Sequence, residues 1–345
     1  MKVKLTLLTA AVLLPLFAHA DTVRPAVAKY LQRAETELNA QSYTAALKDV
    51  DRAAAVGGLS AYESLVVAQL RGAAAAGAGE YALAAKSYQT VLASGAEPPA
   101  TALLLTQAIA GFYAQTNDND SAVIWVNKYV AAGGTDAATR ALGAQGDYNL
   151  GHYGAVAADV KRDAPNAPKT ELQLGALAAQ KAGDDQAYFE ALQALLEAAP
   201  SPVYWDQAIS LVQDAPGFPD GLVVDSYRLR FETGTLSAAG DYEDFAERLI
   251  LAGNPSEAKR VLDAGFASGR LNAQTDGGHA ARLQTLANSQ AAKNPVPPAL
   301  ASVLDAAILS GHGFDKVPGI AKANVNDAQA ALARLWQIQK TKVNE

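Results

Sequence analysis

Polar turns alternate with helical stretches of small and apolar residues along most of this chain. In Gly77–Leu92, a turn of glycine, acid and tyrosine leads into a segment where alanines and an aromatic residue fall at fixed offsets. The sequence contains no convincing run of alternating β-branched residues, which would indicate a strand. The pattern therefore predicts an all-α protein.

The same kind of turn recurs. Its copies begin at Gln41, Gly79, Asn117, Gly151, Gly183 and Gly253. The first five copies are spaced by 32 to 38 residues, and the sixth lies 70 residues after the fifth, about two periods. The proline- and glycine-rich segment Ala215–Gly221 falls where the missing turn is expected. Self-similarity of this period indicates a repeated helix-turn-helix unit.

Small residues flank these turns at constant distances. Seven positions before each turn residue stand Ala34, Gly72, Ala110, Ala144, Ala176 and Ala246, and five positions after it, in most copies, stand Ala46, Ala84, Ala122 and Ala258. Val156 and Tyr188 break the second rule. Two antiparallel helices approach closely only where both carry small side chains at the crossing point. We therefore expect each unit to be a tight helical hairpin.

The spacing resembles that of the tetratricopeptide repeat (TPR) family, from about Thr22 to Gly269. The matching residues of the second unit are Gly72, Gly79, Glu80, Tyr81, Ala84 and Tyr88. Pro200 stands where that family places a closing proline, whereas Ala68 replaces the family's first-helix tryptophan. The resemblance implies a right-handed α-solenoid of degenerate TPR-like hairpins.

The C-terminal region departs from the repeat. Val317-Pro318-Gly319 interrupts the expected second helix after the turn at Gly311–Lys316, because proline costs about 3 kcal/mol inside a helix. Asn326-Asp327 is expected to cap a last helix over 328–339 that closes the end of the stack. The predicted organisation is a signal peptide (1–20), a TPR-like solenoid (21–293) and a shortened last repeat with a capping helix (294–345), joined by a hinge at Asn294–Pro298.

The N-terminal residues predict that the protein is exported. A basic start (Met1–Lys4), an apolar run (Leu5–Phe17) and Ala18-His19-Ala20 follow the pattern of a secretory signal peptide cleaved before Asp21. An uncleaved anchor is the alternative, but the apolar run is shorter than a membrane span requires. We expect the periplasm of a Gram-negative bacterium, with secretion as the alternative.

Composition narrows the classes of function. The chain has no cysteine, so it has neither disulfides nor a thiolate nucleophile. Its formal charge is −7, and loss of the two lysines in residues 1–20 makes it −9. A net acidic chain with scattered bases lacks the electrostatic footprint of a nucleic-acid-binding protein. A polybasic cluster for an anionic membrane surface is also missing.

Candidate catalytic and metal-binding residues are few. His152, His279 and His312 are isolated, and paired histidine spacings do not occur. Asn117–Asp120 lacks the glycine and the distant glutamate of an EF-hand loop, and Asp120 or Ser121 as a helix cap explains it better. We therefore predict no enzyme activity, no cofactor and no metal.

The resemblance to the TPR family implies a concave groove lined by the first helix of each hairpin. The residues at the groove positions that we propose for partner binding are Asn39, Gln69, Gln107, Gln115, Gln145, Tyr148, Asn149, Gln173 and Gln180. A carboxamide both donates and accepts hydrogen bonds, so it can bind a peptide backbone without reading charge. The lysines and arginines by which some members of that family hold a terminal carboxylate are missing. The alternative is that these amides form only a solvent-exposed face.

The leading interpretation is a non-catalytic periplasmic scaffold that binds a protein or an extended peptide in this groove. A narrower resemblance, to exported proteobacterial TPR proteins associated with TonB systems, rests on Pro216-Gly217-Phe218 and Asp225–Leu236, with Val23-Arg24-Pro25 and Ala333–Trp336. That resemblance implies an accessory role at an envelope transport complex. The alternative is an envelope protein that binds a carbohydrate or another small molecule.

Overall fold

The computed structural model describes residues 23–163, 167–274, 278–293, 303–310 and 313–344. The predicted signal peptide (1–20), the proposed hinge at Asn294–Pro298 and His312 lie outside these residues. All regular elements in the described ranges are helices, so the prediction of an all-α solenoid of helical hairpins is confirmed. The chain divides into two compact units, Met1–Val156 and Ala157–Glu345.

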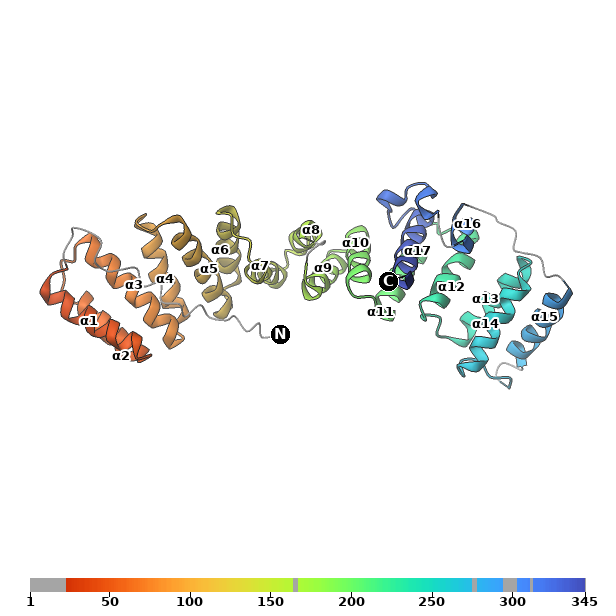
Figure 1. The fold of residues 1–345 in the computed structure, drawn as a ribbon, viewed down its shortest axis with the longest axis horizontal. Coiled ribbons are helices and arrows are strands. Elements are labelled where there is room, and N and C mark those ends of the chain that lie inside the picture. Colours follow the sequence, from red (N-terminus) through yellow and green to blue (C-terminus); the bar gives the residue numbers. More distant parts are fainter. Residues whose placement is uncertain (1–22, 164–166, 275–277, 294–302, 311–312, 345) are drawn as a thin grey trace. The chain divides into compact units, whose positions relative to one another are not determined.

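The first unit is a row of antiparallel helices, in red to yellow in Figure 1. From α1 to α7 each helix packs against the next one, and the first helices of successive hairpins also meet, α1 with α3 and α5 with α7. Its helices are α1 (Pro25–Asn39), α2 (Tyr43–Ala54), α3 (Ala61–Ala78), α4 (Tyr81–Ala93), α5 (Pro99–Gln115), α6 (Asn119–Ala131), α7 (Ala137–Leu150) and α8 (Tyr153–Asp163), which crosses the boundary between the units.

Small residues lie where the predicted crossings require them. Ala34 and Ala46 are fully buried in the first hairpin, as are Ala110 in α5 and Ala84 in α4. The turns also follow the predicted register, because every predicted turn residue has a positive φ. The φ values are 58° at Gln41, 79° at Gly79, 57° at Asn117, 82° at Gly151, 69° at Gly183 and 77° at Gly253.

Helix starts are fixed by local chemistry. Ser60 and Glu63 form a reciprocal capping box at the start of α3, in which each side chain accepts from the other residue's backbone N–H. At α6 the cap is Asp118, whose side chain accepts from the N–H of Ser121 at 3.1 Å. The sequence predicts Asp120 or Ser121 as the cap, and the structure places it at Asp118, before both.

In the described residues of the second unit, the regular elements are again all helices. Consecutive helices pack from α9 to α15, with α13, α14 and α15 around a core of their own. Its elements are α9 (Lys169–Ala182), α10 (Asp185–Ala198), α11 (Pro202–Gln213), η2 (Asp220–Leu222), α12 (Val223–Glu232), α13 (Ala239–Leu251), α14 (Pro255–Ala267), α15 (His279–Lys293), α16 (Val303–Ser310), η4 (Phe314–Lys316), η5 (Ile320–Lys322) and α17 (Ala328–Asn344).

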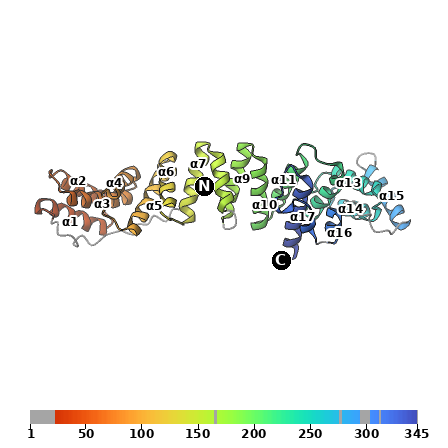
Figure 2. The ribbon, with the colours of Figure 1, turned by 90° about the horizontal axis from the view of Figure 1, so that it is seen from above.

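The terminal helix lies in a different place from the one predicted. Instead of following α15, α17 packs against α10, α11 and α12 (Figures 1 and 2), while α15 packs against α13 and α14. Its apolar residues Leu332, Leu335 and Trp336 are buried in one core with Phe189 of α10 and Trp205 of α11. Aromatic side chains of this size bury large apolar areas, which explains why the chain returns to these helices.

Two short 3-10 turns connect α16 to α17 in place of a complete second helix. They are η4 and η5, separated by Val317-Pro318-Gly319. Asp327 then caps α17, because its Oδ1 accepts from the N–H of Ala330 at 3.2 Å. The interruption and the cap both agree with the sequence prediction, and Gln186 of α10 bonds to the backbone at Ala323 and Val325 just before the cap.

Candidate functional site

The proposed groove residues all lie on first helices of hairpins. In the first unit these are Asn39 on α1, Gln69 on α3, Gln107 and Gln115 on α5, and Gln145, Tyr148 and Asn149 on α7; in the second unit they are Gln173 and Gln180 on α9. Gln69, Gln107 and Tyr148 are half-buried and the other six are exposed.

Three of the amides bond to the hairpin that follows their own. Gln69 donates to Oε1 of Glu97, just before α5, at 2.9 Å. Gln107 of α5 donates to Oγ1 of Thr139 in α7 at 2.8 Å, and Gln173 of α9 donates to the hydroxyl of Tyr204 in α11 at 2.6 Å. These bonds show that the first helices of consecutive hairpins lie side by side, and that these amides tie them together.

A second group of amides forms an exposed chain of hydrogen bonds. Gln145 donates to Oδ1 of Asn149 at 3.0 Å, and Asn149 donates to Oδ1 of Asn119 at 3.1 Å. Beside them the rings of Tyr148 and Tyr153 meet edge to face, with centroids 5.2 Å apart. Gln115, Gln180 and Asn39 are exposed and have no side-chain hydrogen bond to the described residues. Four of the groove amides, Gln69, Gln107, Asn149 and Gln173, therefore bond to a neighbouring hairpin, while Asn39, Gln115 and Gln180 make no such bond.

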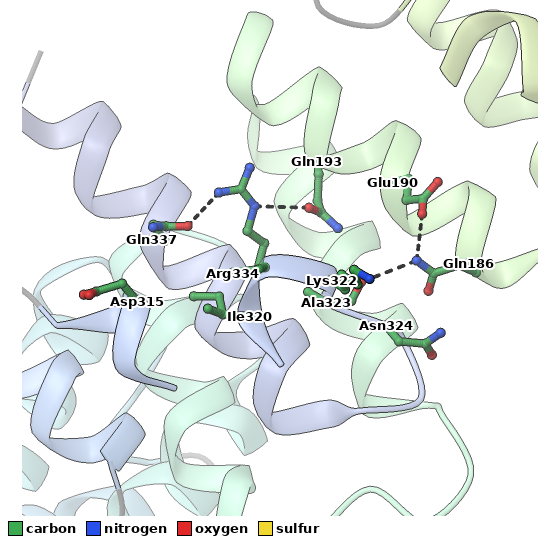
Figure 3. Close-up of a pocket in the computed structure, with 11 residues that line it drawn as sticks. Gln186, Glu190, Gln193, Asp315, Ile320, Lys322, Ala323, Asn324, Arg334 and Gln337 are labelled. Atoms are coloured by element: carbon green, nitrogen blue, oxygen red, sulfur yellow. Dashed lines mark hydrogen bonds between the residues drawn. The ribbon is translucent and has the colours of Figure 1, made fainter. Parts of the chain in front are cut away.

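Sequence reasoning missed a polar cavity of about 850 Å³ in the second unit. It lies between α10, the segment 315–324 and α17 (Figure 3). Its lining consists of Gln186, Glu190, Gln193, Asp315, Ile320, Ala321, Lys322, Ala323, Asn324, Arg334 and Gln337. No motif predicted it, because its residues come from segments more than 100 positions apart in the sequence.

Glutamine side chains hold the walls of this cavity together. Gln186 accepts from the N–H of Val325 at 2.9 Å and donates to the carbonyl oxygen of Ala323 at 3.4 Å, which fixes the loop before α17 to α10. Arg334 donates to Oε1 of Gln193 at 3.3 Å and to Oε1 of Gln337 at 2.6 Å. In Figure 3 the bond from Arg334 to Gln193 reaches from α17 to α10, whereas the bond from Arg334 to Gln337 stays within α17.

Two of the charges around the cavity are paired. Glu190 lies 2.7 Å from Nζ of Lys161, and the guanidinium of Arg334 pairs with Glu197. Lys322 and Asp315 are exposed and form no ion pair with the described residues. The cavity therefore presents one cation and one carboxylate that are available to a ligand.

Metal chemistry finds no support among the described residues. They contain no group of three or more histidine, cysteine, aspartate or glutamate side chains that could hold a metal ion. His152 lies 3.0 Å from Asp147 and His279 lies 2.8 Å from Glu247, both at the surface.

In the part of the chain that the structure describes, no helix combines the length and the hydropathy of a membrane span.

The segment Asp225–Leu236, on which the narrower sequence resemblance rests, connects neighbouring helices in the structure. Arg228 is buried and pairs with Asp225 at 2.9 Å and with Glu257 of α14 at 2.8 Å. Burial opposes its charge, but the hydrogen bonds to Glu257 and the two carboxylates outweigh it and raise the pKa of Arg228. Arg230 reaches back to Asp206, Ser210 and Gln213 of α11. The two arginines therefore connect α12 to helices on either side.

Comparisons with known proteins show limited similarity. No family model matches the chain, and no curated protein matches it. Among solved structures, the chain is similar to the TPR2AB domain in its complex with pHSP90, from yeast Sti1. The identity is 15%, the match covers 77% of this chain and 98% of that chain, and the TM-score is 0.41. The hairpin architecture described above is established by the contacts within this chain.

Proposed function

We propose that this chain is a non-catalytic scaffold that binds a protein or an extended peptide on the surface formed by its first helices. The observation that carries the proposal is the bond between Gln107 and Thr139, which places α5 and α7 side by side. The exposed side chains of Gln115, Gln145 and Asn149 lie on these two adjacent helices. They form the surface that a partner would contact.

The chemistry of that surface suits a peptide backbone. Hydrogen bonds link the side chains of Gln145, Asn149 and Asn119 in a row. At its two ends, the side-chain oxygen of Gln145 and the side-chain nitrogen of Asn119 make no bond with the described residues. One end therefore accepts and the other donates, as a peptide group requires. Because the three side chains are already held by hydrogen bonds to one another, they lose less conformational entropy on binding a partner than free side chains would.

We further propose that the scaffold acts in the periplasm, as an accessory component of an envelope transport complex. Support for export comes from the basic, apolar and small-residue segments within residues 1–20. Sequencing the N-terminus of the protein from the periplasmic fraction tests export. Export predicts a mature chain that begins at Asp21, and an intact Met1 on all recovered protein would contradict it.

Site-specific photocrosslinking tests the binding surface in the cells that make the protein. A photoreactive phenylalanine derivative would replace Gln115 or Gln145 in turn, with Asn127 as the matched control. Asn127 is an exposed amide residue on the second helix α6. The proposal predicts one protein adduct at both first-helix positions and none at Asn127. Equal adducts at all three positions, or none at the first helices, would contradict it.

A further inference from the structure

We propose that the cavity between α10, residues 315–324 and α17 binds an acidic sugar, a polyhydroxylated ligand that carries a carboxylate. This site shares no residue with the first-helix surface. A negative result for the sugar would therefore leave the scaffold proposal unaffected, and the reverse also holds. The volume of about 850 Å³ lies within the range of small-molecule sites in proteins, about 300–1,000 Å³, and leaves room for a disaccharide.

The direction of the hydrogen bonds in the cavity selects the ligand. The side-chain oxygens of Gln193 and Gln337 accept from Arg334, and Oδ1 of Asn324 accepts from the N–H of Asn326 at 2.9 Å. Their amide nitrogens make no bond with the described residues. Three amide donors and the ammonium group of Lys322 therefore remain for a ligand rich in acceptor oxygens.

The charges select a ligand with one carboxylate. Glu190 is paired with Lys161 and Arg334 with Glu197, so Lys322 is the cation that remains to bind an anionic group. In Figure 3, Lys322 and Asn324 lie toward one end of the cavity and Asp315 and Gln337 toward the other. A carboxylate beside Lys322 would thus be separated from the carboxylate of Asp315.

Hydroxyl groups on the ligand would form hydrogen bonds with the other polar side chains of the lining. Asp315 can only accept hydrogen bonds when ionised, so a ligand that reaches it must donate. A sugar hydroxyl donates one hydrogen bond to such a carboxylate and can accept another from the amides of Gln337 and Gln193. Ile320 supplies apolar surface for the ring carbons. A simple dicarboxylate would instead place a second negative charge close to Asp315.

Isothermal titration calorimetry of the full chain with glucuronate tests the proposal, with glucose and succinate as comparison ligands. Glucose lacks the carboxylate, and succinate lacks the hydroxyl groups. We expect glucuronate to bind at least about tenfold more tightly than either, and its affinity to fall with salt because the Lys322 contact is exposed. Absence of glucuronate binding at millimolar concentration, or equal binding of glucose or succinate, would overturn the proposal.

Two variants place the ligand in the cavity. Lys322→Gln removes the cation, and Asn324→Asp keeps the acceptor for Asn326 while it replaces the amide donor with a negative charge. Each is expected to weaken glucuronate binding about tenfold or more without changing the melting temperature, because both side chains are exposed. Lys316→Gln, an exposed lysine outside the lining, is the control and should bind like the wild type. Unchanged binding in both lining variants, or an equal loss in Lys316→Gln, would place the ligand elsewhere and overturn the assignment.

Discussion

The ring of Tyr88 in α4 lies directly against the backbone of Gly72 in α3. A methyl group added to Gly72 would lie 2.3 Å from Cε1 of that ring. The ring also approaches Phe112 of α5, with centroids 6.1 Å apart, and its burial raises the pKa of Tyr88 to about 12. One tyrosine thus packs the crossing within a hairpin and the contact with the next hairpin.

This contact predicts that Gly72→Ala destabilises the first unit. Alanine would normally gain about 1 kcal/mol over glycine inside a helix. Here its methyl group overlaps a buried ring held by Phe112, and we expect a net loss of about 1–3 kcal/mol in the free energy of unfolding, measured by denaturant titration. Gly154→Ala in α8 is the control, because no atom lies within 4 Å of its added methyl group. A more stable Gly72→Ala protein would show that the ring moves freely.

The turn residues predict a stabilising change. Gln41 has a φ of 58°, in the left-handed region that disfavours side chains with a Cβ atom. Gln41→Gly should raise the free energy of unfolding by about 1 kcal/mol, because glycine adopts this conformation without steric cost. Asn117→Gly should gain less, since asparagine tolerates this region better. Thermal denaturation measures both, and a lower melting temperature for Gln41→Gly would contradict the assigned turn.

These packing features could be predicted from sequence because they repeat and are local. A small residue at a helix crossing is required by volume alone, so Ala34, Ala84 and Ala110 reveal the hairpins without knowledge of any partner. The roles of Gln69 and Gln107 could not be predicted in the same way. A carboxamide on a helix looks the same whether it faces water or the next hairpin, and the acceptors Glu97 and Thr139 lie 28 and 32 residues away.

The packing position of α17 could not be predicted from the sequence either. The apolar face of Leu332, Leu335 and Trp336 predicts burial, but it matches any apolar neighbour equally well. Only the three-dimensional structure shows that Phe189 and Trp205 provide that neighbour. The cavity beside α10 follows from this return of the chain, and no local pattern in Gln186 or Arg334 could have indicated it.

A buried carboxylate predicts a pH-dependent contribution to stability. Hydrogen bonds from Arg24, and then from the backbone N–H groups of Ser60 and Arg24, lower the pKa of Glu63 from 4.5 to about 2. Because the pKa is lower in the folded state, the stabilisation is fully present above pH 4.5 and is lost as the pH falls toward 2.

The matching experiment compares the melting temperature of the wild type and Glu63→Gln from pH 7 downward. The difference between them should be largest above pH 4.5 and shrink toward pH 2. Taking the difference removes the contribution of the other carboxylates, which the two proteins share. A difference that stays constant over this window would exclude the Arg24–Glu63 pair as its source.

The buried arginine of the second unit predicts a large loss of stability. Arg228→Leu would remove the guanidinium that lies 2.9 Å from the carboxylate of Asp225, a residue that is only 1% exposed. Removal of one partner of a buried ion pair costs about 3–5 kcal/mol in free energy of unfolding. Arg248→Leu breaks the exposed pair with Asp244 and should cost about 1 kcal/mol or less. Equal losses in the two variants would contradict the role of burial.

The most direct measurement of the central claim is the affinity of the chain for the protein captured at its first helices. The double variant Gln115→Glu/Gln145→Glu removes the unbonded amide donor of Gln115, breaks the bond from Gln145 to Asn149 and adds two charges. The single variant Asn127→Asp introduces a charge in the same way on a second helix. Partner binding through the exposed amides predicts a loss of about tenfold or more in the double variant, with unchanged helicity and near wild-type affinity in Asn127→Asp. Wild-type affinity in the double variant would show that the amides of the first helices form only a solvent-exposed face.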